Sequence, residues 1–201
     1  MRRTKAETNE TILKLLKVAR FHFTRYGYVG AALESIVQET NLTRGAVYHH
    51  FRNKKELFRA VLEDVMREVA EKVEEGASSS GEPWQQLYMG CRAFIITAVE
   101  EQSRRIMLID GPAILGWGNW REMDKNHSMR LLRAQLGDMQ EQGYLRPMPL
   151  DALTHFISGG LNEIALWLAN EPAPQSALDE AMGSLALLLE GMKQQTTLPS
   201  R

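Results

Sequence analysis

The chain of 201 residues contains one cysteine and no apolar run long enough to cross a membrane. A single cysteine excludes an internal disulfide and is typical of a protein from the reducing cytosol. A bilayer-spanning helix needs about 20 predominantly apolar residues. The amino terminus also lacks a signal-peptide pattern. We therefore expect a cytoplasmic protein that has no membrane partner.

Motifs typical of enzymes are also absent from the chain. It has no glycine-rich phosphate-binding loop, no HExxH zinc motif and no GxSxG nucleophile motif. Asp124 and His127 are spaced i, i+3 and would supply half a metal site, but a solvated helix face explains this spacing better. The sequence therefore predicts a protein that is not an enzyme and needs neither a metal nor another cofactor.

What the chain does have is a helix-turn-helix pattern in residues 33–55, LESIVQETNLTRGAVYHHFRNKK. The pattern predicts one helix, a tight turn, a short second helix and the start of a third, as in proteins that place the second helix in the DNA major groove. Its apolar side chains form a small shared core: Leu33, Ile36, Val37, Leu42, Val47 and Phe51. The polar side chains between them remain available at the surface.

Local chemistry predicts where these helices begin and end. The helix Leu33–Thr40 must stop sharply, and Asn41 tolerates a left-handed backbone. Thr43 then caps the next helix through its hydroxyl group. That helix has only about two turns and is too short to be stable alone. Val47 and Phe51 must therefore hold it against the preceding helix.

Two longer helices flank this pattern. Residues 4–26 place Leu15, Ala19 and Phe23 on one face, and Gly27 ends the helix. Asn53 caps the other helix, in a capping-box-like sequence with Glu56 three residues on, and this helix continues to about residue 75.

The run Ile12, Ala19, Phe23, Gly27, Tyr28, Ile36 and then LTRGAVYHHFRNKKEL (42–57) resembles the amino-terminal domain of TetR-family transcriptional repressors. Its most specific part is Gly45-x-x-Tyr48-x-x-Phe51 followed by Lys55-Glu56. Two positions depart from the family pattern. Ala31-Ala32 stand where the family usually has a capping Thr or Ser, so Ser35 is a candidate substitute, and Thr40-Asn41 replace the usual Ala-Gly of the turn.

The resemblance implies a set of DNA contacts. Thr43, Arg44, Gly45 and Ala46 should approach base edges, Tyr48 and His50 the DNA backbone or nearby bases, and Lys54 a phosphate. These roles suit the chemistry, because Arg bonds a guanine edge bidentately while Tyr and Lys donate to phosphates. With the neighbouring Ser35 and His49, the predicted DNA-binding set is Ser35, Thr43, Arg44, Gly45, Ala46, Tyr48, His49, His50 and Lys54. For Tyr48 and His49 the alternative is packing or hydrogen bonding within the domain.

Charge is distributed unevenly along the chain. Residues 1–56 hold eleven Lys and Arg against five acidic residues, a balance of +6, whereas residues 57–201 hold thirteen against twenty, a balance of −7. A basic head on an acidic body is expected if only the head binds a polyanion. A solvated basic patch is the alternative.

The remainder of the chain is also predicted to be helical. After the linker at 76–83, we expect five helices: 83–101, 104–110 (stopped by Gly111-Pro112), 120–142 (after a loop or break at 116–120, and closed by Gly143), 150–170 and 176–194. The predicted fold is all-α with about nine helices. Its parts are a helix-turn-helix DNA-binding domain (1–52), a connecting helix (53–75) and a ligand-binding and dimerisation domain (83–201).

The last two helices are too apolar for an isolated surface position. One of them contains the apolar residues Leu161, Ile164 and Trp167, and the other contains the apolar run 185–189. One explanation is that both pack within the monomer. We favour a self-complementary face that forms a four-helix bundle across a two-fold axis, as a palindromic operator requires.

A small molecule is expected among the middle helices, a region to which the resemblance also points without naming the ligand. Aromatic, flexible apolar and a few polar side chains form the candidate set: Trp84, Cys91, Phe94, Met107, Asp110, Trp117, Trp120, Met123, His127 and Trp167. For each apolar member the alternative is an ordinary core position. Cys91 lies on the inward stripe, so a packed thiol is expected rather than a redox sensor.

Together these features predict a sequence-specific transcriptional regulator. We expect a homodimeric repressor that a small-molecule effector releases from a palindromic DNA operator. A regulator that needs no ligand is one alternative. A non-sequence-specific architectural DNA-binding protein is another, and its binding would be weak and strongly dependent on salt.

Overall fold

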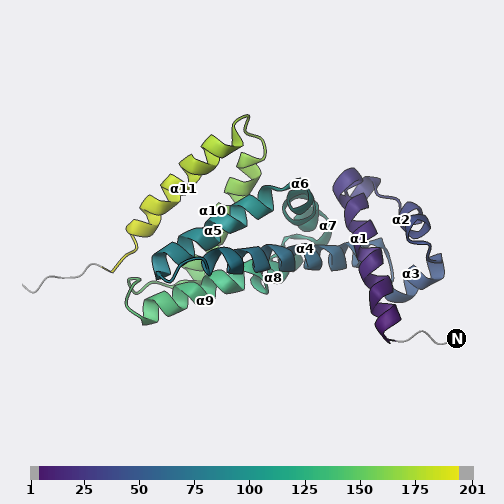
Figure 1. Cartoon of the computed structure of the whole chain (residues 1–201), viewed down its shortest axis with the longest axis horizontal. Helices are drawn as coiled ribbons and strands as arrows, with labels where there is room; N and C mark the ends of the chain where they lie inside the picture. The colour runs from purple at the N-terminus through teal and green to yellow at the C-terminus, as the bar shows by residue number, and fades with distance from the viewer. Residues whose placement is uncertain (1–4, 195–201) are drawn as a thin grey trace, which may run out of the picture. The chain divides into compact units, whose positions relative to one another are not determined.

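The computed structural model describes residues 5–194, which form helices joined by short loops (Figure 1). Among these residues there is no strand, only an isolated antiparallel bridge between Leu145 and Lys193. The all-α prediction is therefore confirmed. No helix in the described part is long and apolar enough to span a membrane. The predicted start of the first helix, at Thr4, lies outside the described residues.

The chain forms two compact units. The first runs to Met66 and also includes Glu100–Met123; the second contains Arg67–Val99 and the chain from Asp124 onward. Helix α4 (Lys54–Ala77) begins in the first unit and ends in the second. The other helices of the first unit are α1 (Lys5–Gly30), α2 (Leu33–Thr40), α3 (Arg44–His50), α6 (Glu101–Ser103), the π-helix η1 (Arg104–Asp110) and α7 (Gly111–Leu115). Most of α8 (Trp117–Lys125) also belongs to it.

Three aromatic rings form the centre of the first unit. The Phe23 and Phe58 centroids are 5.1 Å apart, and Tyr28 lies 5.2 Å from Phe58 and 6.0 Å from Phe23. Around them lie aliphatic side chains that are at most 1% exposed: Leu15, Ala19, Ile36, Val47, Leu57, Val61 and Leu62. This core joins α1, α2, α3 and the start of α4.

The predicted turn chemistry of the helix-turn-helix is confirmed. Asn41 adopts a left-handed backbone (φ 56°, ψ 28°) after α2. The Thr43 hydroxyl accepts a hydrogen bond of 3.1 Å from the Ala46 amide at the start of α3. The Asn53 side chain accepts one of 2.9 Å from the Glu56 amide. Ala32 gives α2 no side-chain cap, as its methyl group dictates.

Gly27 interrupts α1 at the predicted position. Its backbone (φ 69°, ψ 172°) kinks the helix, which then continues to Gly30. At the kink, the Tyr28 amide donates a 2.8 Å hydrogen bond to the carboxylate of Asp110 in η1. A Cβ atom on Gly27 would clash with the Arg105 guanidinium. The kink thus allows η1 to approach α1 closely.

Three predicted boundaries downstream of α5 (Pro83–Val99) are wrong. Gly111-Pro112 does not stop the helix: Gly111 is helical, and the chain continues as α7 because proline is tolerated in a first turn that needs no amide donor. The chain breaks at Gly116 alone (φ 84°), and α8 already begins at Trp117. The long helix predicted for 120–142 is divided, because the non-helical backbone of His127 separates α8 from α9.

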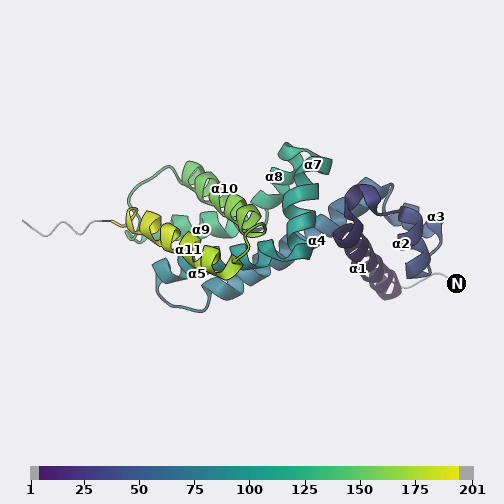
Figure 2. The same ribbon diagram turned by 90° about the horizontal axis from the view of Figure 1, so that it is seen from above.

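The second unit is built from α5, α9 (Ser128–Glu141), α10 (Leu150–Leu168) and α11 (Pro174–Glu190). Helix α10 packs against α5 and α9, and α11 packs on α10 and α5 (Figure 2). Positive φ at Gly143 (77°) ends the turn after α9, as predicted. The core side chains that join α5, α9 and α10 include Ile95, Leu136 and Ala165, all fully buried.

The kink at Gly27 provides a test of the first unit. Gly27→Ala should lower the free energy of unfolding by about 1–2 kcal/mol, the cost of a left-handed conformation for a residue with a Cβ atom. Displacement of Arg105 should add to this loss. Urea unfolding monitored by circular dichroism, at fixed protein concentration, measures the change.

Gly118→Ala is the matched control for this variant. Gly118 lies in α8, where an added Cβ meets nothing within 4 Å. This substitution should leave stability unchanged or raise it by up to about 1 kcal/mol. Equal stability of the two variants would show that the kink needs no glycine.

Candidate DNA-binding surface and ligand cavity

Helix α3 has one buried side and one open side. Val47 is 1% exposed and anchors the helix on the core, whereas Arg44, Gly45 and His49 are exposed and Tyr48 is 38% exposed. A Cβ atom added to Gly45 would meet nothing within 4 Å. The open side is therefore free for close approach by a large partner.

Arg44 is held in place by neighbours on that surface. Its Nη2 atom donates a 3.3 Å hydrogen bond to the Tyr48 hydroxyl and lies 3.4 Å from a carboxylate oxygen of Glu34 in α2. The hydrogen bond to Tyr48 and the charge of Glu34 raise the pKa of Arg44. Because these groups are exposed, water and salt screen the pairing. The guanidinium can thus exchange Glu34 for another acceptor at small cost.

Lys54 lies at the start of α4, beside the end of α1. Its ammonium group donates to the Val29 carbonyl oxygen over 3.4 Å and lies 4.6 Å from the centre of the Tyr28 ring. Partial burial lowers the pKa of Lys54, and the charge of Glu34 opposes this shift. The α1 kink therefore helps to position a cation next to the recognition helix.

The remaining predicted DNA-binding residues also lie at the surface of this helix-turn-helix. Ser35 and Thr43 are exposed, and Ala46 and His50 are partly exposed. The His49 and His50 rings meet edge to face at 5.5 Å. All the predicted residues thus come from α2, α3 and the segments next to them, where Figure 1 shows α2 beside α3. Their contacts with DNA stay a prediction.

Glu34 is the neighbour that sequence reasoning missed. Its partner Arg44 is ten positions away on another helix, so no helical spacing indicates the pair. Only the angle between α2 and α3 brings the two charges together.

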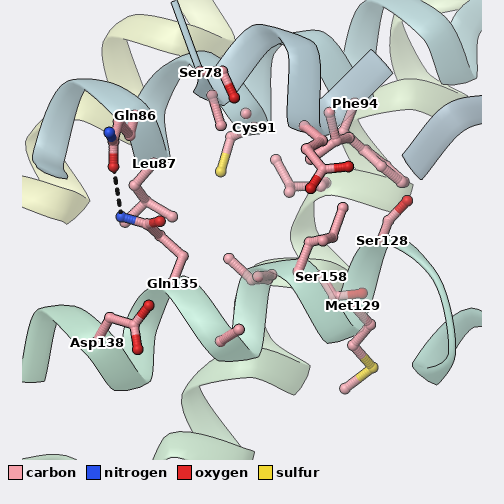
Figure 3. A pocket seen from close by; sticks show the side chains of 18 residues that line it. Ser78, Gln86, Leu87, Cys91, Phe94, Ser128, Met129, Gln135, Asp138 and Ser158 are labelled. Atoms are coloured by element: carbon pink, nitrogen blue, oxygen red, sulfur yellow. Dashed lines mark hydrogen bonds between the residues drawn. The ribbon is translucent and has the colours of Figure 1, made fainter. Parts of the chain in front are cut away.

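The second unit contains a cavity of about 280 Å³ (Figure 3). The end of α4, together with α5, α9 and α10, supplies its walls. The lining residues are Val73, Glu74, Ala77, Ser78, Gln86, Leu87, Gly90, Cys91, Phe94, Ser128, Met129, Leu131, Leu132, Ala134, Gln135, Asp138, Ser158 and Leu161. Two of the predicted ligand-binding residues, Cys91 and Phe94, are among them.

The other predicted ligand-binding residues do not line this cavity. Met107, Asp110, Trp117, Trp120 and Met123 belong to the first unit. There the Trp120 indole donates a 2.7 Å hydrogen bond to the Met107 carbonyl, and the Asp110 carboxylate accepts a hydrogen bond from the Tyr28 amide. The side chains of Trp120 and Asp110 thus stabilise the region around η1.

Trp84, His127 and Trp167 also lie outside the cavity lining. The Lys193 ammonium lies 5.6 Å from the centre of the Trp84 ring, and His127 precedes α9. Trp167 lines a separate apolar groove of about 720 Å³ between α10 and α11. Helical spacing placed all three on plausible faces, but it does not show which faces meet.

Cys91 is a buried thiol at the wall of the cavity. It is 3% exposed, and burial raises its pKa to about 12. Since the thiolate is the reactive form, this environment makes Cys91 a poor nucleophile near neutral pH. The geometry agrees with the predicted packed thiol.

This burial predicts slow alkylation of the native protein. Between pH 7 and pH 9, iodoacetamide should label Cys91 at least about a hundredfold more slowly in native protein than in urea, because reactivity follows the thiolate fraction and access. Mass spectrometry of timed samples gives both rates. Similar rates in the two states would contradict a packed thiol.

Two family profiles match most of the chain. The family described as "Bacterial regulatory proteins, tetR family" matches residues 15–61. The description "Tetracyclin repressor-like, C-terminal domain" matches residues 84–192. The second match alone covers more than half of the chain.

Individual relatives agree with the profiles. A TetR-family transcriptional regulator from Pectobacterium atrosepticum has a solved structure with 32% identity, a TM-score of 0.78, and coverage of 96% of this chain and 99% of that one. The Transposon Tn10 TetC protein of Escherichia coli is 21% identical over 80% of this chain and 81% of its own length. The HTH-type transcriptional regulator TtgR of Pseudomonas putida is 38% identical over 32% of this chain and 31% of its own.

The resemblance read from residues 12–57 is thus confirmed, and it extends over nearly the whole chain. The solved relative has the same all-helical fold, with the helix-turn-helix at the amino-terminal end. The chain belongs to the TetR family and is a sequence-specific DNA-binding transcriptional regulator.

Proposed function

We propose that the protein is a homodimeric repressor that a small molecule releases from a palindromic operator. The observation that carries this proposal is the open side of α3, where Arg44 and Tyr48 stand on a helix anchored by Val47. Because DNA is its proposed target, we place the protein in the cytoplasm.

Direct readout is assigned to the start of α3. The Arg44 guanidinium matches the two acceptors on a guanine edge, and the bare backbone at Gly45 lets the helix sit deep in the groove. Tyr48 and Lys54 are assigned to the phosphates, which fix the position of the helix. The balance of +6 over residues 1–56 favours binding of the polyanion by this part of the chain.

Dimerisation is assigned to the outer faces of α10 and α11. Phe156 is 72% exposed, Leu187 is 77% exposed and Leu188 is 58% exposed, around an apolar groove. Apolar side chains that gather on one face mark an interaction site. A second copy related by a two-fold axis would cover both faces and form a four-helix bundle. To read two half-sites one DNA turn apart, a dimer must hold its two recognition helices about 34–36 Å from each other.

Ligand release is assigned to the cavity of the second unit. Val73, Glu74 and Ala77 at the end of α4 line this cavity, and the same helix begins at Lys54 beside the recognition helix. A ligand that shifts the end of α4 would change the spacing of the two recognition helices. Ligand and operator would then weaken each other's binding by the same factor.

Two substitutions should separate readout from phosphate binding. Arg44→Ala should weaken binding to the specific site by about 1–3 kcal/mol and leave non-specific binding less affected. Lys54→Ala should weaken binding to all sequences alike and reduce the salt slope by about 1. Fluorescence anisotropy with specific and scrambled duplexes across a salt series measures both effects.

Arg130→Ala is the charge-matched control for these variants. Arg130 is exposed on α9 in the second unit. Loss of affinity equal to that of Arg44→Ala would mean that overall charge, rather than base contact, governs binding. Substantial unfolding of either α3 or α4 variant would contradict the assigned roles.

Footprinting tests the whole proposal. Purified protein on the intergenic DNA upstream of its own gene should protect a discrete two-fold symmetric site, because a symmetric dimer reads two half-sites. Diffuse protection that fades uniformly with salt would favour an architectural DNA-binding protein instead.

Leu187→Glu places a charge in the proposed dimer face, so this variant should be a monomer by sedimentation and should lose the symmetric footprint.

A further inference from the structure

We propose that the cavity of the second unit binds a compact, largely apolar organic cation, such as a protonated amine on an aromatic or aliphatic frame. The proposal rests on the assignment of this cavity as the effector site. It names the class of effector from three properties of the wall: its size, its hydrogen-bonding groups and its charge.

The size of the cavity limits the ligand. An apolar cavity of roughly 150 Å³ holds one benzene molecule. The volume here is about 280 Å³, so a ligand of one or two rings, or one ring with a short chain, would fill it. Leu87 and Phe94 of α5 and Leu161 of α10 provide buried apolar surface on two facing walls. The frame of the ligand is therefore expected to be apolar.

The amide pair of the wall offers a hydrogen-bond acceptor to a ligand. The Nε2 atom of Gln135 donates to Gln86 Oε1 over 3.3 Å and to the Pro83 carbonyl over 3.5 Å. Gln86 Nε2 donates to the Ser80 carbonyl over 2.8 Å. The Gln135 amide oxygen accepts no hydrogen bond from the described part of the chain, and Figure 3 shows this side chain at the cavity wall. A ligand that satisfies this oxygen must carry an N–H or O–H donor.

The charged groups of the wall have one sign. Glu74 and Asp138 line the cavity, and its lining contains no Lys, Arg or His. An ammonium group is attracted by these carboxylates, whereas a carboxylate or phosphate ligand would be repelled and would find no cationic partner. The ring of Phe94 adds a surface that also favours a cation. All three properties thus agree on a cationic donor with an apolar frame.

Three probes of one frame test the charge preference directly. The full-length protein is titrated by calorimetry with 4-phenylbutylamine, 4-phenylbutanol and 4-phenylbutyrate, which differ only in the end group. The amine should bind roughly tenfold more tightly than the alcohol, because its charge is attracted by two carboxylates that water partly screens. The carboxylate should bind most weakly. Raising the salt concentration should narrow the difference between amine and alcohol.

Matched variants identify the groups responsible. Glu74→Gln with Asp138→Asn should bring the affinity for the amine to that for the alcohol and leave the alcohol unchanged. Glu141→Gln with Glu171→Gln removes the same charge from residues outside the lining and should keep the preference. Cys91→Leu places a larger side chain in the cavity and should lower the affinity for every probe that binds.

Several results would overturn the proposal. They are a carboxylate probe that binds as tightly as the amine, a preference that survives the Glu74→Gln and Asp138→Asn changes, and a wild-type protein that binds none of the three. The footprint without any probe tests the regulator function separately. Amine binding with the predicted preference, but without release of DNA, would support the ligand class and contradict ligand release.

Discussion

The structure depends on the burial of a small aromatic and aliphatic core beneath a helix that cannot exist alone. Helix α3 has seven residues, whereas isolated helices shorter than about 12–15 residues are marginal in water. Phe23 and Phe58 form the centre of this core, and Val47 is buried on it. Burial of Val47 leaves Arg44 and Tyr48 on the outward side of the helix. Because the core already fixes the backbone of α3, this backbone loses little further freedom when the helix binds a partner. The apolar contacts that stabilise the first unit are therefore also the ones that position its recognition surface.

The second unit meets a different constraint, since it must bury enough apolar surface to fold while it leaves two apolar regions open. One is the cavity lined by Cys91 and Phe94, and the other is the face of α10 and α11 around Phe156. Both regions leave apolar surface exposed in the monomer. In the proposed function, a ligand would bury the first region and a second copy of the chain would bury the second. Anything that binds only the folded state stabilises it. The proposed ligand and dimer contacts are thus linked to the stability of the same four helices.

Local signals in the sequence predicted the helix-turn-helix part of the first unit, residues 33–56, almost residue by residue. The backbone preference of Asn41 and the capping hydroxyl of Thr43 indicate the turn, so α2 and α3 begin and end where expected. Features that depend on contacts between helices could not be predicted from local sequence. Helix α7 passes through Pro112 because a proline in a first turn breaks no hydrogen bond, and the sequence alone does not show which turn is first. Gln135 and Gln86 meet from different helices, as do Glu34 and Arg44, and no spacing along the chain encodes such pairs.

In the proposed function, the core of the first unit presents the open side of α3 to DNA. Hydrogen exchange of the full-length protein, measured by mass spectrometry, tests it with the footprinted duplex and with a scrambled duplex of equal composition. We expect the specific duplex to slow exchange over Thr43–Lys54 and the scrambled duplex to slow it much less. Unchanged exchange over this segment with the specific duplex, or equal protection by both duplexes, would show that α3 does not read the DNA sequence.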